Sequence, residues 1–320
     1  MEKKLTVSPS PHVHGSDTTA KLMRDVIIAL LPALAVSTVA FGLNVLVVAA
    51  VSVACCLLFE FLIQKYLLRG PFTLCNWSAA VTGLLLAFNL PTTIPLWIVA
   101  VGALVAIGIG KMTYGGLGKN PFNPALVGRV FLLIAYPVQM TSFPADANTG
   151  ATPLAFVKEA LKSGTPMSEI LDKIDYQTLF TGFMSGSMGE VSAAALLLGF
   201  VYLLIRRVIT WHTPVAVLGS MALFSGILWA VNPEAYMSPL FHLLTGGAIL
   251  GAVYMATDYV TSPMTPKGML IYGCGIGIIT ILIRVWGAYP EGMSFAILIM
   301  NAVVCLINKY VKPRRFGIKK

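Results

Sequence analysis

The sequence is poor in charged residues. Of its 320 residues only 11% are Asp, Glu, Lys or Arg, against about 25% in an ordinary soluble domain. Hydrophobic residues make up 57% of the chain, which leaves too little polar surface to cover a water-soluble globule. The chain is therefore predicted to lie in a membrane, with apolar runs that approach the roughly 20 residues needed to span the hydrocarbon core.

Other features are missing as well, and each absence argues against one class of function or site. The five cysteines show no CxxC or other ligand-pair spacing, so an iron–sulfur cluster held by this chain alone is not expected. No two of the four histidines stand at i, i+4 on one helix, so no metal site is predicted within the chain. No GxGxxG follows a strand, which argues against a dinucleotide-binding fold. The first 20 residues carry no apolar stretch of the kind found in a cleavable signal peptide.

The net charge of +9 comes from residues that flank apolar segments rather than from one basic stripe. That distribution is typical of membrane proteins, in which Lys and Arg gather in cytoplasmic loops, and it does not favour nucleic acid as a partner. The basic tail at 310–320 is predicted to face anionic membrane lipid on the cytoplasmic side.

Ten apolar segments are predicted to be transmembrane helices, which makes the fold an all-α polytopic membrane protein. With the N-terminus inside, most basic residues fall in inner loops, and both termini are predicted to be cytoplasmic. The outer side keeps Lys158, Lys162, Lys173 and Arg284. The ten ranges are about 25–43, 44–64, 76–91, 93–110, 123–137, 191–206, 213–231, 238–257, 268–287 and 292–309.

Five segments precede one long hydrophilic stretch and five follow it. An odd number of segments in each half would make the halves an inverted repeat. Segments 76–91 and 123–137 are short and bounded by Asn and Pro, which is typical of the broken helices that build binding sites in transporters. The predicted organisation is a cytoplasmic lead-in at 1–24, a first transmembrane half at 25–137, an outer loop at 138–190, a second transmembrane half at 191–309 and the tail at 310–320.

Glycines recur in the eighth and ninth segments, 238–257 and 268–287. They are predicted to allow close packing between helices rather than to form cofactor loops.

Loops as long as this outer loop are either functional or disordered in compact proteins. Two stretches of it, 153–162 and 168–180, have the periodicity of short helices, so the loop is predicted to be folded and functional. Its most informative stretch runs from Asp146 to Thr149-Gly150-Ala151-Thr152. Taken by itself, this is an ordinary polar turn in which Thr152 caps a helix and Pro153 takes the first helical position.

The same stretch resembles the signal at which a transferase attaches FMN to threonine through a phosphoester: an acidic residue, two positions, then Ser/Thr-Gly-Ala-Thr. That signal occurs in the family formed by the D subunit of Rnf complexes and the B subunit of the sodium-translocating NADH:quinone reductase. Further stretches resemble the family in the same order, namely 114–131, 186–190 and 255–266. The chain length fits the Rnf members better, and Thr149 stands where serine is common.

This resemblance implies that FMN is attached to Thr152, with Asp146, Thr149, Gly150 and Ala151 as its recognition context. The small Gly and Ala side chains would let the transferase and the flavin phosphate approach the backbone. A helix that starts after Thr152 would offer its N-terminal N–H groups to the phosphate.

The resemblance also implies a subunit of a bacterial inner-membrane complex that transfers electrons between reduced ferredoxin and NAD and moves Na⁺ or H⁺. Its partners would be the flavin- and iron–sulfur-bearing subunits of the Rnf complex, together with the flavin transferase during maturation. The cofactors would carry the redox chemistry, so no catalytic side chain is expected and the chain would not be complete alone.

Asn120, Asn123 and Arg129 are candidates for binding a second, non-covalent flavin such as riboflavin. Side-chain amides offer donors and acceptors to the edge of an isoalloxazine ring. An arginine inside a membrane segment has to be paired or hydrated, so Arg129 is a functional candidate. The structural alternative is that Asn123 is a helix cap in front of Pro124.

Asp258 and Glu190 are candidates for an ion path. Asp258 lies in a Thr/Ser-rich turn whose oxygens could coordinate a hard cation. Glu190 opens a membrane segment, and the alternative is that it only complements a helix dipole.

Two other functions fit the same layout. A transporter or channel without redox function would share the five-plus-five plan and the broken segments, as urea- and ammonium-channel-like folds do. A structural scaffold subunit would not need Thr152 for electron transfer. Thr152 therefore discriminates among the three functions.

Overall fold

This computed structural model describes residues 18–69, 74–143, 152–163, 174–182, 186–190 and 192–313. These residues form helices joined by turns and irregular segments, and none of them forms a strand. The all-α prediction is confirmed for these residues. Most of the predicted lead-in and of the basic tail lies outside them.

The first half of the chain forms helices over most of the first five predicted ranges, and several of these helices extend beyond the predicted ends. They are α1 (Thr19–Phe41), α2 (Asn44–Leu62) continued by the π-helical η1 (Ile63–Leu68), the 3₁₀ turn η2 (Leu74–Asn76), α3 (Ser78–Phe88), α4 (Leu96–Leu104) continued by the π-helical η3 (Val105–Met112), α5 (Pro124–Ala135) and the short α6 (Pro137–Thr141).

The outer loop and the second half supply the remaining elements. They are α7 (Pro153–Lys162), α9 (Tyr176–Thr181), α10 (Ala193–Ile205), α11 (His212–Val231), α12 (Pro239–Leu244), α13 (Ala248–Leu250) continued by the π-helical η4 (Gly251–Met255), α14 (Pro266–Trp286) and α15 (Met293–Tyr310). The eighth predicted segment, 238–257, is thus divided among α12, α13 and η4.

Five helices in the described part of the chain are long and apolar enough to cross a membrane: α1, α2 with η1, α11, α14 and α15. Four more are apolar but shorter, namely α3, α4 with η3, α5 and α10. The 11 residues of α3 rise about 16 Å, which is less than a hydrocarbon core of about 30 Å, and all of them are buried. The chain is a multi-pass membrane protein in which the short helix α3 is enclosed by other helices, while the short helices α4 and α10 each keep an exposed apolar face.

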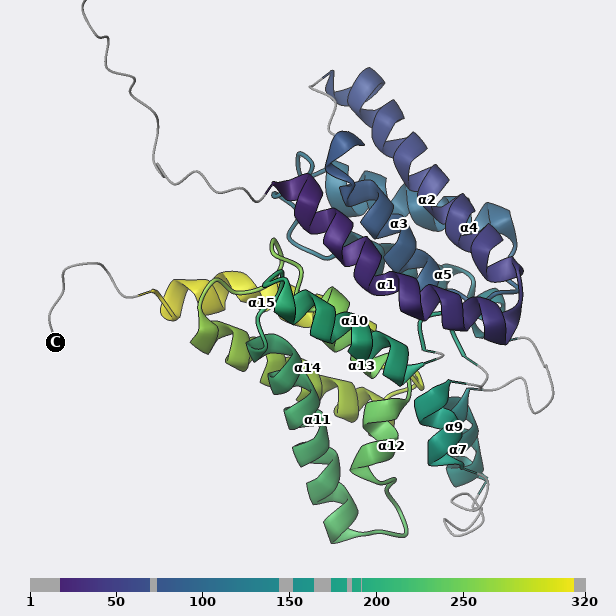
Figure 1. Ribbon diagram of the computed structural model, residues 1–320. Coiled ribbons are helices and arrows are strands. Elements are labelled where there is room, and N and C mark those ends of the chain that lie inside the picture. The colour runs from purple at the N-terminus through teal and green to yellow at the C-terminus, as the bar shows by residue number, and fades with distance from the viewer. Residues whose placement is uncertain are drawn as a thin grey trace, which may run out of the picture.

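The two halves form two groups of helices that meet along α1 and α10 (Figure 1). A second contact between the groups joins α5 to α15. Outside both groups, α7 and α9 pack on α12 through a small apolar cluster that includes Leu154, Val157, Leu179 and Phe241. The two described helices of the outer loop, α7 and α9, are therefore folded onto the second half.

The break between α12 and α13 corrects one prediction. Gly246 and Gly247 have φ values of +64° and +61°, in the left-handed region that residues with a side chain rarely adopt. A Cβ on Gly246 would also come within 2.3 Å of Leu154 and 2.6 Å of Arg284. These two glycines do not simply pack helices together, since they allow the chain to leave one helix and begin another.

The predicted close packing does occur at Gly277, where α14 meets α11. A Cβ at this position would lie 2.0 Å from Ser220 Oγ and 2.7 Å from the Val217 carbonyl oxygen. We expect Gly277→Ala to destabilise the chain by about 1–3 kcal/mol, because the Val217 backbone cannot move aside as a side chain can. Thermal unfolding in detergent measures this. The control is Gly219→Ala on α11, where a Cβ has no neighbour within 4 Å; equal effects at both positions would contradict the packing argument.

Candidate functional site

Thr152 is the residue of the predicted flavin motif that the structure describes. It stands directly before α7, and its Oγ1 accepts a hydrogen bond from the Ala155 amide at 3.2 Å. Its carbonyl oxygen accepts from the Phe156 amide at 2.9 Å, and the residue is only 5% exposed. Thr152 is therefore the N-cap that its position before Pro153 predicts. Asp146, Thr149, Gly150 and Ala151 lie outside the described residues.

Thr152 lines a cavity of about 140 Å³ between α7, α5 and the turn before α15, here called the outer cavity. Its lining includes Asn89, Arg129, Ser187, Tyr289 and Glu291. Among the described lining residues Arg129 is the only cation and Glu291 the only anion. A hydroxyl, a cation and a carboxylate thus share one small space.

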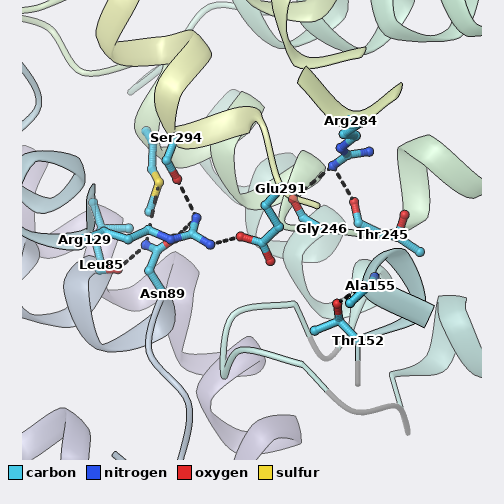
Figure 2. Close-up of polar contacts among 11 residues, drawn as sticks. Leu85, Asn89, Arg129, Thr152, Ala155, Thr245, Gly246, Arg284, Glu291 and Ser294 are labelled. Carbon is cyan, nitrogen blue, oxygen red and sulfur yellow. Dashed lines mark hydrogen bonds and ion pairs between the residues drawn. The ribbon is translucent and has the colours of Figure 1, made fainter. Parts of the chain in front are cut away.

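The Arg129 guanidinium is held from three sides (Figure 2). It donates to Asn89 Oδ1 at 2.8 Å and to Ser294 Oγ at 2.5 Å, and it forms an ion pair with Glu291. Asn89 is itself fixed, since its Nδ2 donates to the Leu85 carbonyl at 2.6 Å. Arg129 Nε is buried and has no hydrogen-bond partner among the described residues. The guanidinium retains a donor that a further acceptor could use.

A second arginine, Arg284 on α14, lies beside the break between α12 and α13. It donates to the carbonyl oxygens of His242 at 2.6 Å, Thr245 at 2.9 Å and Gly246 at 3.0 Å. These carbonyls belong to the last turn of α12 and to the two residues that follow it, where no continuing helix satisfies them. Arg284 therefore fills the place of the missing N–H groups. Glu190 is buried near both arginines, and its charge interacts with Arg129 and Arg284.

Asn120 and Asn123 line a different cavity, of about 80 Å³, here called the inner cavity. Asn123 Oδ1 caps α5 through the Ala125 amide at 3.1 Å, and its Nδ2 donates to the Met255 carbonyl at 3.1 Å. Asp258 lines the same cavity and accepts from Thr261 Oγ1 at 3.1 Å. The structure thus brings Asn120, Asn123 and Asp258 together, whereas Arg129 joins Thr152 instead.

Sequence reasoning missed one cluster at the inner cavity. Lys111 Nζ lies 2.7 Å from Glu60 Oε2 and 2.7 Å from Ser78 Oγ. Lys111 is 2% exposed and Glu60 is fully buried. The position of Lys111 after an apolar run predicts an inner loop, but the π-helical η3 carries it inward. The available signal was Glu60, a carboxylate inside a membrane segment, since such a group requires a partner.

A cavity larger than these two, of about 420 Å³, lies on the other side of α7. It is lined mostly by apolar and aromatic side chains, together with Lys158, Arg284 and His242. Pro290 lines both this cavity and the outer cavity. The volume of the 420 Å³ cavity falls in the range of about 300–1,000 Å³ that is usual for small-molecule sites.

Comparison with known proteins places this arrangement in a family. The family model described as "NQR2, RnfD, RnfE family" matches residues 6–317. The chain belongs to this family. A relative from Acetobacterium woodii, named as the D subunit of the Na(+)-translocating ferredoxin:NAD(+) oxidoreductase complex, is 46% identical over all of this chain and 97% of its own length.

Two further relatives cover nearly the whole chain. The D subunit of the proton-translocating ferredoxin:NAD(+) oxidoreductase complex of Clostridium ljungdahlii is 39% identical over 98% of this chain and 97% of its own. The D subunit of the ion-translocating oxidoreductase complex of Vibrio cholerae is 38% identical over 97% of this chain and 99% of its own. The family membership is thus carried by the full length, while the relatives' names differ in the ion.

Proposed function

We propose that this chain is the D subunit of an ion-translocating ferredoxin:NAD⁺ oxidoreductase complex and that it carries FMN as a phosphoester on Thr152. The names of three full-length relatives support the complex. The observation that carries the flavin assignment is the position of Thr152, which shares the outer cavity with the buried Arg129.

The residues around Thr152 fit such a group. A phosphodiester formed on Thr152 Oγ1 carries one negative charge, which is stabilised at the N-terminus of α7 and by a nearby cation. Arg129 Nε is a buried donor with no partner in the described region, and the 420 Å³ cavity beside α7 offers apolar space for a flat ring. The bound flavin would supply the redox chemistry, and the chain would anchor it and neutralise its phosphate.

A second, non-covalent flavin such as riboflavin is proposed for the inner cavity. Asn120 and Asn123 line it, and apolar residues such as Val81 and Leu85 line it as well. Arg129 is then not part of this site, because it bonds to Asn89, Ser294 and Glu291. The two proposed flavin sites lie on opposite ends of α5, which is a suitable arrangement for moving electrons through the bundle.

The two halves are proposed to be an inverted repeat with ten membrane segments. Paired contacts between equivalent helices support this, since α1 meets α10 and α5 meets α15. Each half also has a left-handed break in its third segment, at Trp77 in one and at Gly246 and Gly247 in the other. A buried cation stands next to each break: Lys111 bonds to Ser78, and Arg284 bonds to Gly246.

The orientation and the ion path complete the proposal. Both termini are cytoplasmic in a bacterial inner membrane, and the flavin on Thr152 is on the outer side. Asp258 at the inner cavity and Glu190 beside the outer one are the proposed ion-path residues. The other Rnf subunits, the flavin transferase and membrane lipid are the proposed partners.

The mass of the tryptic peptide that ends at Lys158 tests the flavin on Thr152. In the complex from cells that make the transferase, we expect this peptide to gain the mass of FMN less one water, and the denatured subunit to fluoresce in a gel. Thr152→Ala should abolish both signals and the ferredoxin-dependent reduction of NAD⁺. The control is Thr181→Ala at the exposed end of α9.

The same experiment separates the competing functions. A wild-type subunit that is dark and unmodified would favour a transporter or channel without redox function. A modified subunit whose Thr152→Ala variant still supports full electron transfer would favour a structural scaffold.

A further inference from the structure

The outer cavity contains one ion pair that the proposed flavin would disturb. A phosphodiester on Thr152 brings an anion into a space whose described lining already holds Glu291 against Arg129. Two anions and one cation in a buried cavity are unfavourable, because the unpaired charge keeps its desolvation cost. One of the two anions has to leave when the flavin is present.

Arg129 is the fixed partner of this pair. Its guanidinium is anchored by Asn89 and Ser294, which come from two other parts of the bundle, the end of α3 and the start of α15. Both of these partners are neutral, so neither replaces the carboxylate as a counter-charge. The cation therefore stays in the cavity whatever happens to Glu291.

Glu291 is the movable partner. It lies in the turn between α14 and α15, after Pro290 and before Gly292, and its side chain is 15% exposed against 8% for Arg129. Lys158 of α7 donates to the Gly287 and Tyr289 carbonyls of the same turn. The turn that carries Glu291 is thus tied to the helix that begins after Thr152.

From this geometry we infer that Glu291 is a placeholder for the flavin phosphodiester: it neutralises Arg129 in the unmodified chain and is displaced toward water when the modified Thr152 takes its place. The inference rests on the proposed attachment of FMN to Thr152. It assigns Arg129 as the residue that binds the flavin phosphate. The Glu291 carboxylate then serves as the counter-charge of Arg129 only in the chain without flavin.

The test compares wild type and Glu291→Gln, each made with and without the flavin transferase. In the full-length chain purified without the transferase, Glu291→Gln should lower the unfolding temperature by about 5 °C, because Arg129 loses the carboxylate of its ion pair. The buried Glu190, whose charge also interacts with Arg129, is shared with Arg284 and is the same in every variant compared. In the flavin-loaded chain the same substitution should cause no fall, since the phosphodiester pairs with Arg129. Glu234→Gln, an exposed carboxylate in another turn, is the control in both forms.

The outcomes separate the inference from the proposed function. Loading is measured first, and an unmodified Lys158 peptide in the transferase strain would refute the proposed function itself. If the wild type is loaded but Glu291→Gln lowers the unfolding temperature equally in both forms, the placeholder is wrong while the covalent flavin stands. If the Glu291→Gln chain accumulates in the strain with the transferase but not in the strain without it, the inference is supported. If the chain accumulates in neither strain, the inference is overturned.

Discussion

Replacing Lys111 with methionine is expected to destabilise the chain by about 3–5 kcal/mol. The substitution leaves the Glu60 carboxylate buried without the ammonium that lies 2.7 Å away in the native chain. Gln64 Nε2 donates to the other Glu60 oxygen at 3.3 Å, but a neutral donor does not balance a full charge. Thermal unfolding in detergent and the amount of the chain found in the membrane measure the effect.

A double replacement tests whether the charge of the pair is the cause. Lys111→Met with Glu60→Leu should recover most of the lost stability, because an apolar pair of similar volume carries no desolvation cost. Lys119→Met is the control, since Lys119 is exposed on the same side of the molecule. If the double variant is as unstable as Lys111→Met alone, the loss comes from packing and not from the unpaired Glu60.

Replacing Arg284 with methionine is expected to have the other largest effect, a loss of about 3 kcal/mol or more. Three buried carbonyl oxygens, those of His242, Thr245 and Gly246, would lose their donor at once. Each orphaned buried acceptor costs about 1–3 kcal/mol. The loss should appear as a lower unfolding temperature and as faster proteolysis between α12 and α13.

Two further variants define the role of Arg284. Arg284→Lys should recover only part of the stability, because an ammonium lacks the planar fork that reaches three carbonyls together. Lys267→Met changes an exposed cation at the other end of the same helix and should be nearly neutral. A fully stable Arg284→Met variant would mean that other groups satisfy the break.

Most helices could be predicted from the sequence, and the physical reason is simple. Long apolar runs have to bury their backbone polar groups inside helices when they enter a membrane. The exception is the eighth range, 238–257, which is as apolar as its neighbours but divided at Thr245–Gly247. Glycine in an apolar run is compatible with either close helix packing or a left-handed break, and the sequence alone does not distinguish them.

The local part of the site could also be predicted, because it depends on adjacent residues. Thr152 and Asn123 each precede a proline and each cap the helix that follows. The contacts between distant residues could not be predicted, because the partners of Arg129 lie 40, 162 and 165 positions away from it in the sequence. Lys111 escaped prediction for the same reason, because only the tertiary structure brings Glu60 next to it.

The burial of Thr152 has a consequence for how the protein is made. A transferase needs the hydroxyl oxygen in its own active site, but in the finished fold that oxygen is buried and already accepts the Ala155 amide. Attachment of the proposed flavin would therefore require a state in which α7 is not packed on α12 and the Thr152 hydroxyl is exposed. The fraction of chains that carry the flavin would then depend on two rates, the rate of modification by the transferase and the rate at which α7 packs on α12.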